Sequence, residues 1–195
     1  MSASAALCVV LGYLSGSVPF GVLLALGVAG EDVRTQGSGN IGATNVARVV
    51  GKKWGLVVLV LDASKGALPV LATLVRFPDH PWLQAVAGLA AVLGHVFPVW
   101  LKFRGGKGVA TSLGALAVLA PAAAGLGALA FVFVFAIFRL SSLGSLIGAL
   151  VAVASMWAMR GPRAHAGLGT VLLLLLVWTH RSNLARLWRR QETRL

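Results

Sequence analysis

The chain has 195 residues, of which 58% are hydrophobic and only 11% charged, and its mean hydropathy is +0.88. Soluble domains carry about a quarter charged residues, so this composition excludes a water-soluble globular domain. The formal net charge of +12 would suit a nucleic-acid-binding protein, but most Lys and Arg residues here flank apolar stretches, as they do beside membrane spans. We therefore predict a membrane protein that binds no nucleic acid.

Apolar segments long enough to cross a bilayer follow one another along the chain. In lipid such segments are helical, because their backbone finds no water to bond. We predict an all-α, polytopic integral membrane protein in which residues 1–195 form a single transmembrane domain of seven transmembrane helices, some of them short. The predicted spans are residues 3–28, 54–75, 82–101, 109–121, 123–138, 143–159 and 165–180.

The region 109–138 decides the number of spans. As one helix it would be about 45 Å long, too long for a hydrocarbon core of about 30 Å. Pro121 lies near its middle and removes a helical hydrogen bond, so two short helices are favoured, with a re-entrant pair as the alternative. The first span contains the run 15–21 (SGSVPFG), whose small residues and proline favour close helix packing and a kink.

The distribution of basic residues predicts the orientation. With seven spans, thirteen of the 17 Lys and Arg residues fall on one face of the membrane: Arg34, Arg48, Lys52, Lys53, Lys102, Arg104, Lys107, Arg139, Arg181, Arg186, Arg189, Arg190 and Arg194. Only Arg76, Arg160 and Arg163 fall on the other face, so the basic face is cytoplasmic and the N-terminus lies outside. Residues 1–30 lack Lys and Arg, which favours a true first span over a cleavable signal peptide.

The longest polar loop contains the densest motif, GSGNIGATNVAR at residues 37–48. It matches the dinucleotide fingerprint G-x-G-x-x-G, but a membrane helix precedes it and no βαβ unit follows, so nucleotide binding of that kind is rejected. Glycines still let backbone N–H groups face an anion, and an arginine offers a planar fork for phosphate. The candidate substrate-binding residues are Ser38, Gly39, Asn40, Gly42, Thr44, Asn45 and Arg48. The alternative is a flexible connector.

The next polar loop, residues 102–108 (KFRGGKG), resembles half of a P-loop. A Walker motif needs Ser or Thr directly after the lysine, and Gly108 stands there, so nucleotide hydrolysis is disfavoured. Gly105 and Gly106 beside Lys107 can still form an anion cradle at the start of a helix. The alternative is ordinary basic flanking of a span.

Several further polar residues are candidates. His180 and Asn183, three residues apart at the end of the last span, would share a helical face, where the histidine could bond a phosphate or transfer a proton. Alone, an interfacial histidine is more often an anchor. Asp62 and Lys65 lie inside the second span, where a structural ion pair is favoured over contact of Lys65 with substrate. His95 could orient the second loop, although a core histidine is the simpler interpretation.

Acidic groups are scarce in the predicted cytoplasmic loops, which contain no carboxylate pair and no Cys/His cluster suited to a metal. The candidate site is therefore rich in donors and cations and poor in bases. Such a site suits the binding of phosphate and the transfer of an already activated group. We expect neither a metal nor another cofactor.

Six segments resemble, in order along the chain, those of the bacterial acyl-phosphate-dependent glycerol-3-phosphate acyltransferases, an integral membrane family. They are residues 15–21, 37–48, 62–66, 94–111, 142–145 and 180–183. The resemblance implies a seven-helix fold in the bacterial inner membrane, with a cytoplasmic active site. It also implies transfer of a fatty acyl group from acyl phosphate to the 1-hydroxyl of glycerol-3-phosphate. The products are lysophosphatidic acid and phosphate, and the reaction is the first step of phospholipid biosynthesis.

The resemblance also implies residue roles. The polar site would be lined by Ser38, Thr44, Arg48, Lys107, Ser142, His180 and Asn183. Of these, Lys107, His180, Asn183 and Arg48 are expected to be catalytic, and Ser142 to bind substrate. The base could be His180 or a substrate phosphate oxygen, and Arg48 could hold either phosphate. The alternative function is a transporter of phosphorylated solutes, which needs polar groups near the midplane, where the sequence offers only Asp62 and Lys65.

Overall fold

The computed structural model describes residues 2–194, which form helices and contain no strand, so the all-α prediction is confirmed. In chain order the elements are α1 (Ala3–Ser17), α2 (Phe20–Ala29), α3 (Ala43–Val49), α4 (Lys52–Arg76), α5 (Pro81–Val96), the 3-10 helix η1 (Val99–Leu101), α6 (Val109–Leu119), α7 (Pro121–Phe138), α8 (Ser141–Ala158), α9 (Arg163–Thr179) and α10 (Arg181–Trp188). The chain divides into two compact units, the first ending at Ala115 and the second beginning at Leu116.

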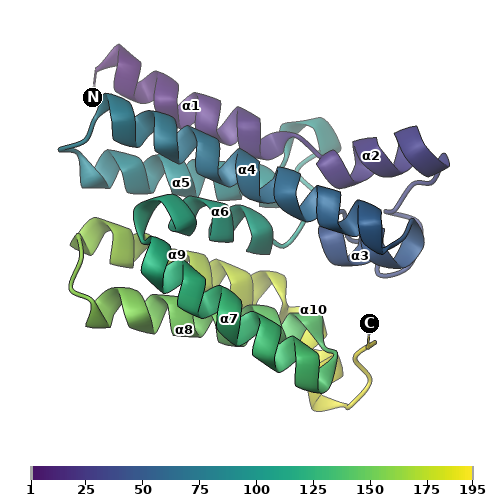
Figure 1. Ribbon diagram of the computed structural model, residues 1–195. Helices are drawn as coiled ribbons and strands as arrows, with labels where there is room; N and C mark the ends of the chain where they lie inside the picture. The colour runs from purple at the N-terminus through teal and green to yellow at the C-terminus, as the bar shows by residue number, and fades with distance from the viewer. Residues whose placement is uncertain (1, 195) are drawn as a thin grey trace. The chain divides into compact units, whose positions relative to one another are not determined.

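Each unit is built from helices that are neighbours in sequence. In the first unit α1 packs against α4 and α5, and the short helices α2 and α3 lie against α4 (Figure 1). In the second unit α7 and α8 form a tightly packed pair, and α9 lies against α8. The chain bends by 60° between α9 and α10.

Five helical segments of the described chain are long and apolar enough to cross a membrane: Ala3–Ala29, Lys52–Arg76, Pro81–Leu101, Pro121–Phe138 and Ser141–Ala158. The bent pair of α9 and α10 can supply a sixth. The predicted span 109–121 falls short, because α6 has 11 residues. A helix of that length is about 16 Å long, roughly half of the hydrocarbon core. The number of seven spans is therefore not confirmed. The predicted helix break near Pro121 is confirmed, since α7 begins with this proline in its first turn.

Helices of the first unit approach one another closely at glycines. A Cβ on Gly16 of α1 would lie 1.9 Å from the carbonyl oxygen of Ala91 in α5. A Cβ on Gly66 of α4 would lie 2.1 Å from the carbonyl oxygen of Thr111 in α6. Small residues allow backbones to come this near in a membrane, where hydrophobic burial drives helix association weakly. The expected close packing of the run 15–21 is thus confirmed.

A small apolar core holds the polar end of the first unit together. Its buried members come from α2, the following loop, α3 and α4: Val22, Ala25, Val33, Ile41, Val46 and Val58. Leu101, which ends η1, packs against the same cluster. The core therefore brings the glycine-rich segments 37–48 and 102–108 to the same end of this unit.

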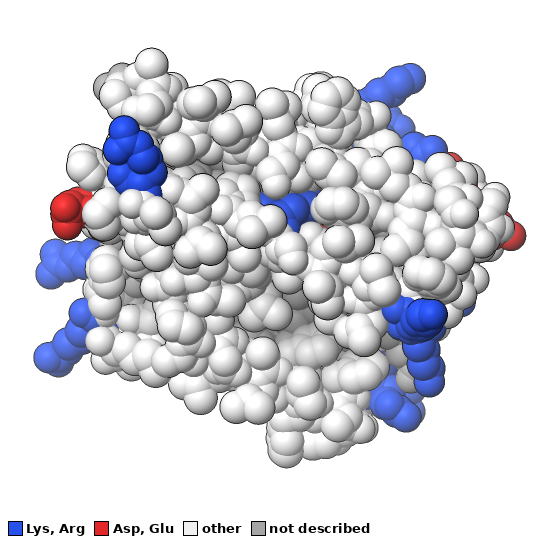
Figure 2. Space-filling view, turned by 45° about the horizontal axis from the view of Figure 1, so that its top comes forward, with Lys and Arg blue, Asp and Glu red and all other residues white. Residues whose placement is uncertain are grey.

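Much of the remaining surface is apolar. Leu129 and Phe133 of α7 are 67% and 69% exposed, and Trp82 of α5 is 67% exposed. Figure 2 shows a face of the molecule on which most atoms belong to uncharged residues. Water-soluble monomers rarely expose large continuous apolar patches, so lipid is the solvent that this surface fits.

Candidate functional site

The loop that carries the first motif is shaped by Asn45 of α3, whose side chain is buried. Its Nδ2 donates to the carbonyl oxygens of Val33, at 2.8 Å, and Gln36, at 3.1 Å. Its Oδ1 accepts a hydrogen bond from the Ser38 N–H at 2.8 Å. Gly37 has a φ of +59°, and a Cβ there would lie 2.3 Å from the Asn45 Oδ1. Asn45 therefore ties the loop to α3, and the loop needs glycine where the two meet.

Of the other polar side chains of this motif, that of Asn40 shapes the fold, and three make no hydrogen bond within the described residues. The Asn40 Oδ1 accepts the Gly42 N–H at 2.9 Å and so shapes the backbone before α3. The side chains of Ser38, Thr44 and Arg48 make no hydrogen bond or ion pair with other residues in 2–194. Arg48 is half-buried in the last turn of α3. These three side chains are thus available to a ligand.

Arg34, in the same loop, differs from Arg48 because it already has an anion. Its Nε lies 2.9 Å from one carboxylate oxygen of Asp32, and its Nη2 lies 2.6 Å from the other. Hydrogen bonds from Arg34 lower the pKa of Asp32 to about 2. The pair is solvent-exposed, and such pairs contribute little to stability. The loop therefore contains one paired arginine and one without a partner in the described chain.

The second motif folds back onto the last turn of α5. The Gly106 N–H donates to the carbonyl oxygen of His95, and the Gly105 N–H to that of Val96, both at 3.0 Å. Lys107 follows directly and is half-buried. It precedes the start of α6, whose first N–H groups carry the positive end of the helix dipole. Because the Gly105 and Gly106 N–H groups are donated to α5, they do not form the predicted anion cradle. The groups here that suit phosphate are Lys107 and the first N–H groups of α6.

Behind this loop lies a buried group of ionisable side chains, each 2% or 3% exposed. The Lys65 Nζ is 2.8 Å from the Asp62 Oδ1 and donates to the carbonyl oxygen of Val18 at 2.7 Å. The His95 Nδ1 lies 3.7 Å from the same Asp62 oxygen. The predicted ion pair inside the second span is confirmed, and His95 is its neighbour.

In the second unit, the carboxylate of Glu192 joins two of the predicted site residues. The Ser142 Oγ donates to its Oε1 at 3.0 Å, and the Asn183 Nδ2 donates to the same oxygen. The Arg186 Nε donates to its Oε2 at 2.7 Å. The C-terminal tail is thereby held against the first turn of α8 and against α10.

Sequence reasoning missed Glu192 and Arg186. Burial alone would raise the pKa of the Glu192 carboxyl, but hydrogen bonds from Asn183, Arg186 and Ser142 outweigh it, and this pKa lies below its ordinary value. A usable sign was present in the sequence, because Glu192 is the one acid after residue 180, among five arginines. A single acid in such a basic tail favours an internal partner.

His180 sits at the bend between α9 and α10 and is 2% exposed. Its Nδ1 lies 2.8 Å from the carbonyl oxygen of Leu176. A carbonyl only accepts, so Nδ1 carries the hydrogen, and in the neutral ring Nε2 is the nitrogen that can accept a proton. His180 is the N-cap of α10, and its carbonyl oxygen accepts the Leu184 N–H at 2.8 Å, so His180 and Asn183 both belong to the first turn of that helix.

The predicted residues thus fall into two sets. Those of segments 37–48 and 102–108 share one end of the first unit, and Ser142, His180 and Asn183 belong to the second unit. No three His, Cys, Asp or Glu side chains in residues 2–194 form a group that could hold a metal ion.

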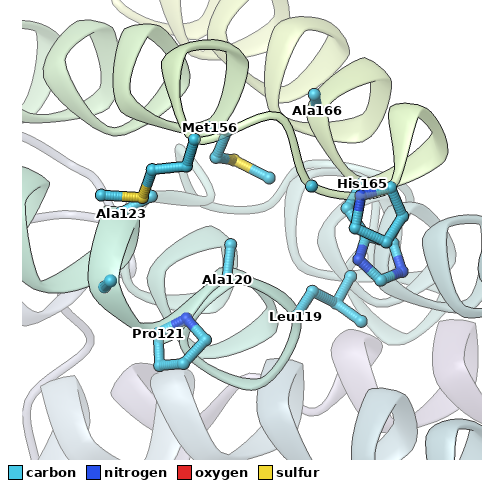
Figure 3. Close-up of a pocket in the computed structure, with 11 residues that line it drawn as sticks. Leu119, Ala120, Pro121, Ala123, Met156, His165 and Ala166 are labelled. Carbon is cyan, nitrogen blue, oxygen red and sulfur yellow. The ribbon is translucent and has the colours of Figure 1, made fainter.

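A cavity of about 180 Å³ lies elsewhere in the second unit. Its walls come from the connection between α6 and α7, from α8 and from the start of α9, with Met156 and His165 on different sides (Figure 3). The lining is mostly apolar and includes none of the predicted site residues. This cavity is therefore not the candidate phosphate site.

Comparison with known proteins gives consistent results. Residues 6–190 match the family described as glycerol-3-phosphate acyltransferase. The glycerol-3-phosphate acyltransferase of Myxococcus xanthus (strain DK1622) is 58% identical, over 95% of this chain and 97% of that protein. The protein of the same name from Synechococcus elongatus is 44% identical, over 95% of this chain and 91% of its own length.

Two crystal structures of PlsY (YgiH), an integral membrane glycerol 3-phosphate acyltransferase, have the same fold. The glycerol 3-phosphate form superimposes with a TM-score of 0.95 at 38% identity, covering 98% of this chain and 96% of that one. The lysophosphatidic acid form gives a TM-score of 0.92 at 37% identity, with 98% and 95% covered. The similarity therefore extends over the whole length of both proteins, in sequence and in fold.

Proposed function

Since the chain belongs to the glycerol-3-phosphate acyltransferase family, we propose that it moves a fatty acyl group from acyl phosphate to the 1-hydroxyl of glycerol-3-phosphate. The products are lysophosphatidic acid and inorganic phosphate. The protein is a multi-pass membrane acyltransferase of phospholipid biosynthesis. In this proposal the acyl donor is acyl phosphate, and the protein lies in the bacterial inner membrane. The short helix α6 is a seventh membrane segment, the N-terminus is external and the active site faces the cytoplasm. The two ligands named for the related PlsY structures support the acceptor and the product.

The observation that carries the proposal is the pair of glycine-rich segments at one end of the first unit, with Arg48 unpaired there among the described residues and Lys107 beside α6. Two phosphate-bearing substrates repel each other in water. Cations and backbone N–H groups at one place offset that repulsion and let both be held together. Arg48 and Lys107 therefore neutralise the two phosphates, while Ser38, Thr44 and the first N–H groups of α6 contact their oxygens. The N–H groups of Gly39, Gly42, Gly105 and Gly106 are donated within the chain, so these glycines shape the loops rather than bind phosphate.

The reaction needs little covalent chemistry from the protein. Acyl phosphate is a mixed anhydride, so the hydroxyl oxygen of the acceptor attacks the carbonyl carbon, and the bond from that carbon to the phosphate oxygen breaks. The hydroxyl proton passes to a base, either the His180 Nε2 or a phosphate oxygen of the substrate. Positioning of two reactants can lower the barrier by about 7–11 kcal/mol. Cationic donors facing the developing charge supply a few kcal/mol more.

In this scheme the polar residues of the second unit named by the resemblance also act on the substrates. The Ser142 Oγ, whose hydrogen is donated to Glu192, accepts a hydrogen bond from a substrate hydroxyl, and the Asn183 Nδ2 donates its second hydrogen to a substrate oxygen. His180 presents its Nε2 to the acceptor hydroxyl. The acyl chain lies among the helices, in contact with lipid. Distances measured by spin labels at positions next to Arg48 and His180 would test whether the two sets face one substrate pair.

The direct test uses purified protein in detergent with palmitoyl phosphate as donor. We expect phosphate release that depends on glycerol-3-phosphate and is accompanied by an equal amount of lysophosphatidic acid. Release without acceptor, or no reaction in a folded preparation, would contradict the proposal. Labelled glycerol-3-phosphate should show no counterflow in proteoliposomes, because the deep polar groups Asp62, Lys65 and His95 lie against one another.

A further inference from the structure

His95, at the end of α5, contacts two different structures at once. Its carbonyl oxygen accepts the Gly106 N–H at 3.0 Å, and its ring lies directly against the same glycine. A Cβ built on Gly106 would lie 2.1 Å from the His95 Nε2 and 2.9 Å from Cε1. On the opposite edge of the ring, Nδ1 is 3.7 Å from the Asp62 Oδ1. One imidazole therefore connects a buried carboxylate to the glycine-rich loop.

The carboxylate end of this connection is firmly held. Asp62 is paired with Lys65, whose Nζ also donates to the carbonyl oxygen of Val18 and lies 5.6 Å from the centre of the Phe20 ring. The Ser15 Oγ donates to the backbone carbonyl of Lys65 at 3.3 Å. Contacts from α1, α2 and α4 thus fix the position of Asp62, and with it the group that faces the histidine.

Packing alone does not explain a histidine here. The ring is 3% exposed, and its Nδ1 makes no hydrogen bond with any described residue. Burying a polar nitrogen costs free energy that an apolar side chain of similar size would avoid. A nearby carboxylate offsets part of that cost and also selects one orientation of the ring. The orientation it selects is the one that places Nε2 against Gly106.

We propose that His95 is a positioning residue for acyl transfer: oriented by Asp62, its ring forms the surface on which Gly106 rests and so sets the backbone that precedes Lys107. The inference rests on the proposed role of the 105–107 segment in phosphate binding. Gly106 is then glycine for a steric reason, because its φ is not in the left-handed region. Removing the ring should therefore make room for a side chain at that position.

The test is a pair of double-mutant cycles. We expect Gly106→Ala to reduce kcat/KM about a hundredfold, the scale of a loop displaced by about 1 Å. In a His95→Asn or His95→Ala background, the same substitution should cost less than about threefold, because the clashing ring atoms are gone. Asn keeps a polar group near Asp62, and it provides a second variant if Ala fails to fold.

Gly105→Ala is the matched control. A Cβ on Gly105 would lie 2.1 Å from the carbonyl oxygen of His95, which is backbone and stays when the side chain is changed. Its loss of activity should therefore be the same with and without the His95 substitution. If Gly106→Ala lowered kcat/KM by the same factor with and without the His95 substitution, the proposal would be overturned. It would also be overturned if the His95 substitution reduced the losses of Gly105→Ala and Gly106→Ala equally.

A readout separate from acyl transfer is the rise in melting temperature produced by inorganic phosphate. We expect the His95→Asn variant to need at least about ten times more phosphate for the same rise in melting temperature, because one positioning contact is lost. The substitution His165→Ala, at another buried histidine outside the predicted site, should lower the melting temperature without changing the phosphate response. If His95→Asn weakens phosphate binding as expected but the protein does not use acyl phosphate as a donor, the proposed function fails and this inference stands. An unchanged phosphate response in His95→Asn overturns the inference alone.

Discussion

The two units differ in whether the polar side chains of the predicted site are hydrogen-bonded within the chain. In the first unit, Arg48, Ser38 and Thr44 have no polar partner within residues 2–194, and other side chains hold the loops in shape. In the second unit, Ser142 and Asn183 are bonded to the carboxylate of Glu192. Ser142 and Asn183 are thus occupied by an internal carboxylate, whereas Arg48, Ser38 and Thr44 are open to a ligand.

This difference separates function from stability. A group without an internal partner can be removed at little cost to folding, so its loss should appear mainly in activity. A group that bonds the tail contributes to folding, and its loss should appear in both. Substitutions in the two units therefore test whether the contrast is real.

The largest expected effect is that of Lys107→Ala. Loss of one donor that faces developing charge costs about a hundredfold or more in rate. We expect at least that fall in kcat, measured on protein that elutes from size-exclusion chromatography like the unchanged protein. Near-normal turnover would mean that Lys107 only sets the orientation of the chain in the membrane.

Arg48 should come next, with Arg34 as its matched control in the same loop. A charge-assisted hydrogen bond is worth about 1.5–3 kcal/mol, so Arg48→Gln should lower kcat/KM about ten- to a hundredfold. Arg34→Gln should leave kcat/KM within about twofold, because its pair with Asp32 is exposed. Equal effects of the two substitutions would remove the distinction between paired and open cations.

Asn45→Ala should sharpen the comparison from the structural side of the first unit. It removes three hydrogen bonds that hold the loop from Val33 to Ser38. Leaving buried partners unsatisfied costs about 1–3 kcal/mol each, so the free energy of unfolding should fall. Kinetics should show a raised KM for one phosphate substrate, of about tenfold or less, because the loop loses its shape while Arg48 remains. An unchanged KM would show that the loop shape is not needed for binding.

Glu192→Gln tests the second unit. The substitution keeps the size of the side chain but removes the charge that Arg186, Asn183 and Ser142 contact. We expect the free energy of unfolding to fall by about 1–2 kcal/mol and kcat/KM to fall only a few-fold. Thermal unfolding followed by intrinsic tryptophan fluorescence would measure the first quantity. Full stability in the Gln variant would mean that the tail is not anchored by this carboxylate.

The smallest expected effect is the pH dependence of that anchor. The folded pKa of Glu192 is below its ordinary value of 4.5, so the folded protein binds the proton more weakly than the unfolded chain does. The stabilisation is then complete above about pH 4.5 and is lost as the pH falls through the lower, folded pKa. The melting temperature of the unchanged protein should fall more steeply in that range than that of Glu192→Gln. Parallel curves would contradict the assignment.

Local chemistry made part of this molecule predictable. Pro121 predicted the end of one helix and the start of another, because proline lacks the N–H that an unbroken helix needs. The pairing of Asp62 and Lys65 followed from their spacing and the cost of an unpaired charge in lipid. Such features depend on residues within one or two helical turns.

Features that depend on distant residues were not predictable in the same way. The contact of Ser142 with Glu192 joins residues 50 positions apart, and no local pattern indicates it. Asn45 looks like a ligand-binding amide in the sequence, and only the folded loop shows that its amide is committed to backbone. The end of α6 at Leu119 lies two residues before the predicted end at 121, since Pro121 belongs to the first turn of α7.

The close approach of helices distinguishes two kinds of glycine within the helices. At Gly16 and Gly66 a methyl group would collide with a neighbouring backbone, so a mutational scan should find these positions intolerant of alanine. At Gly125 and Gly167, within α7 and α9, an added Cβ meets nothing within 4 Å. Alanine in a helix interior is favoured over glycine by up to about 1 kcal/mol. A more stable variant for work in detergent could therefore be sought at the second kind of position, where the close helix–helix contacts are not disturbed.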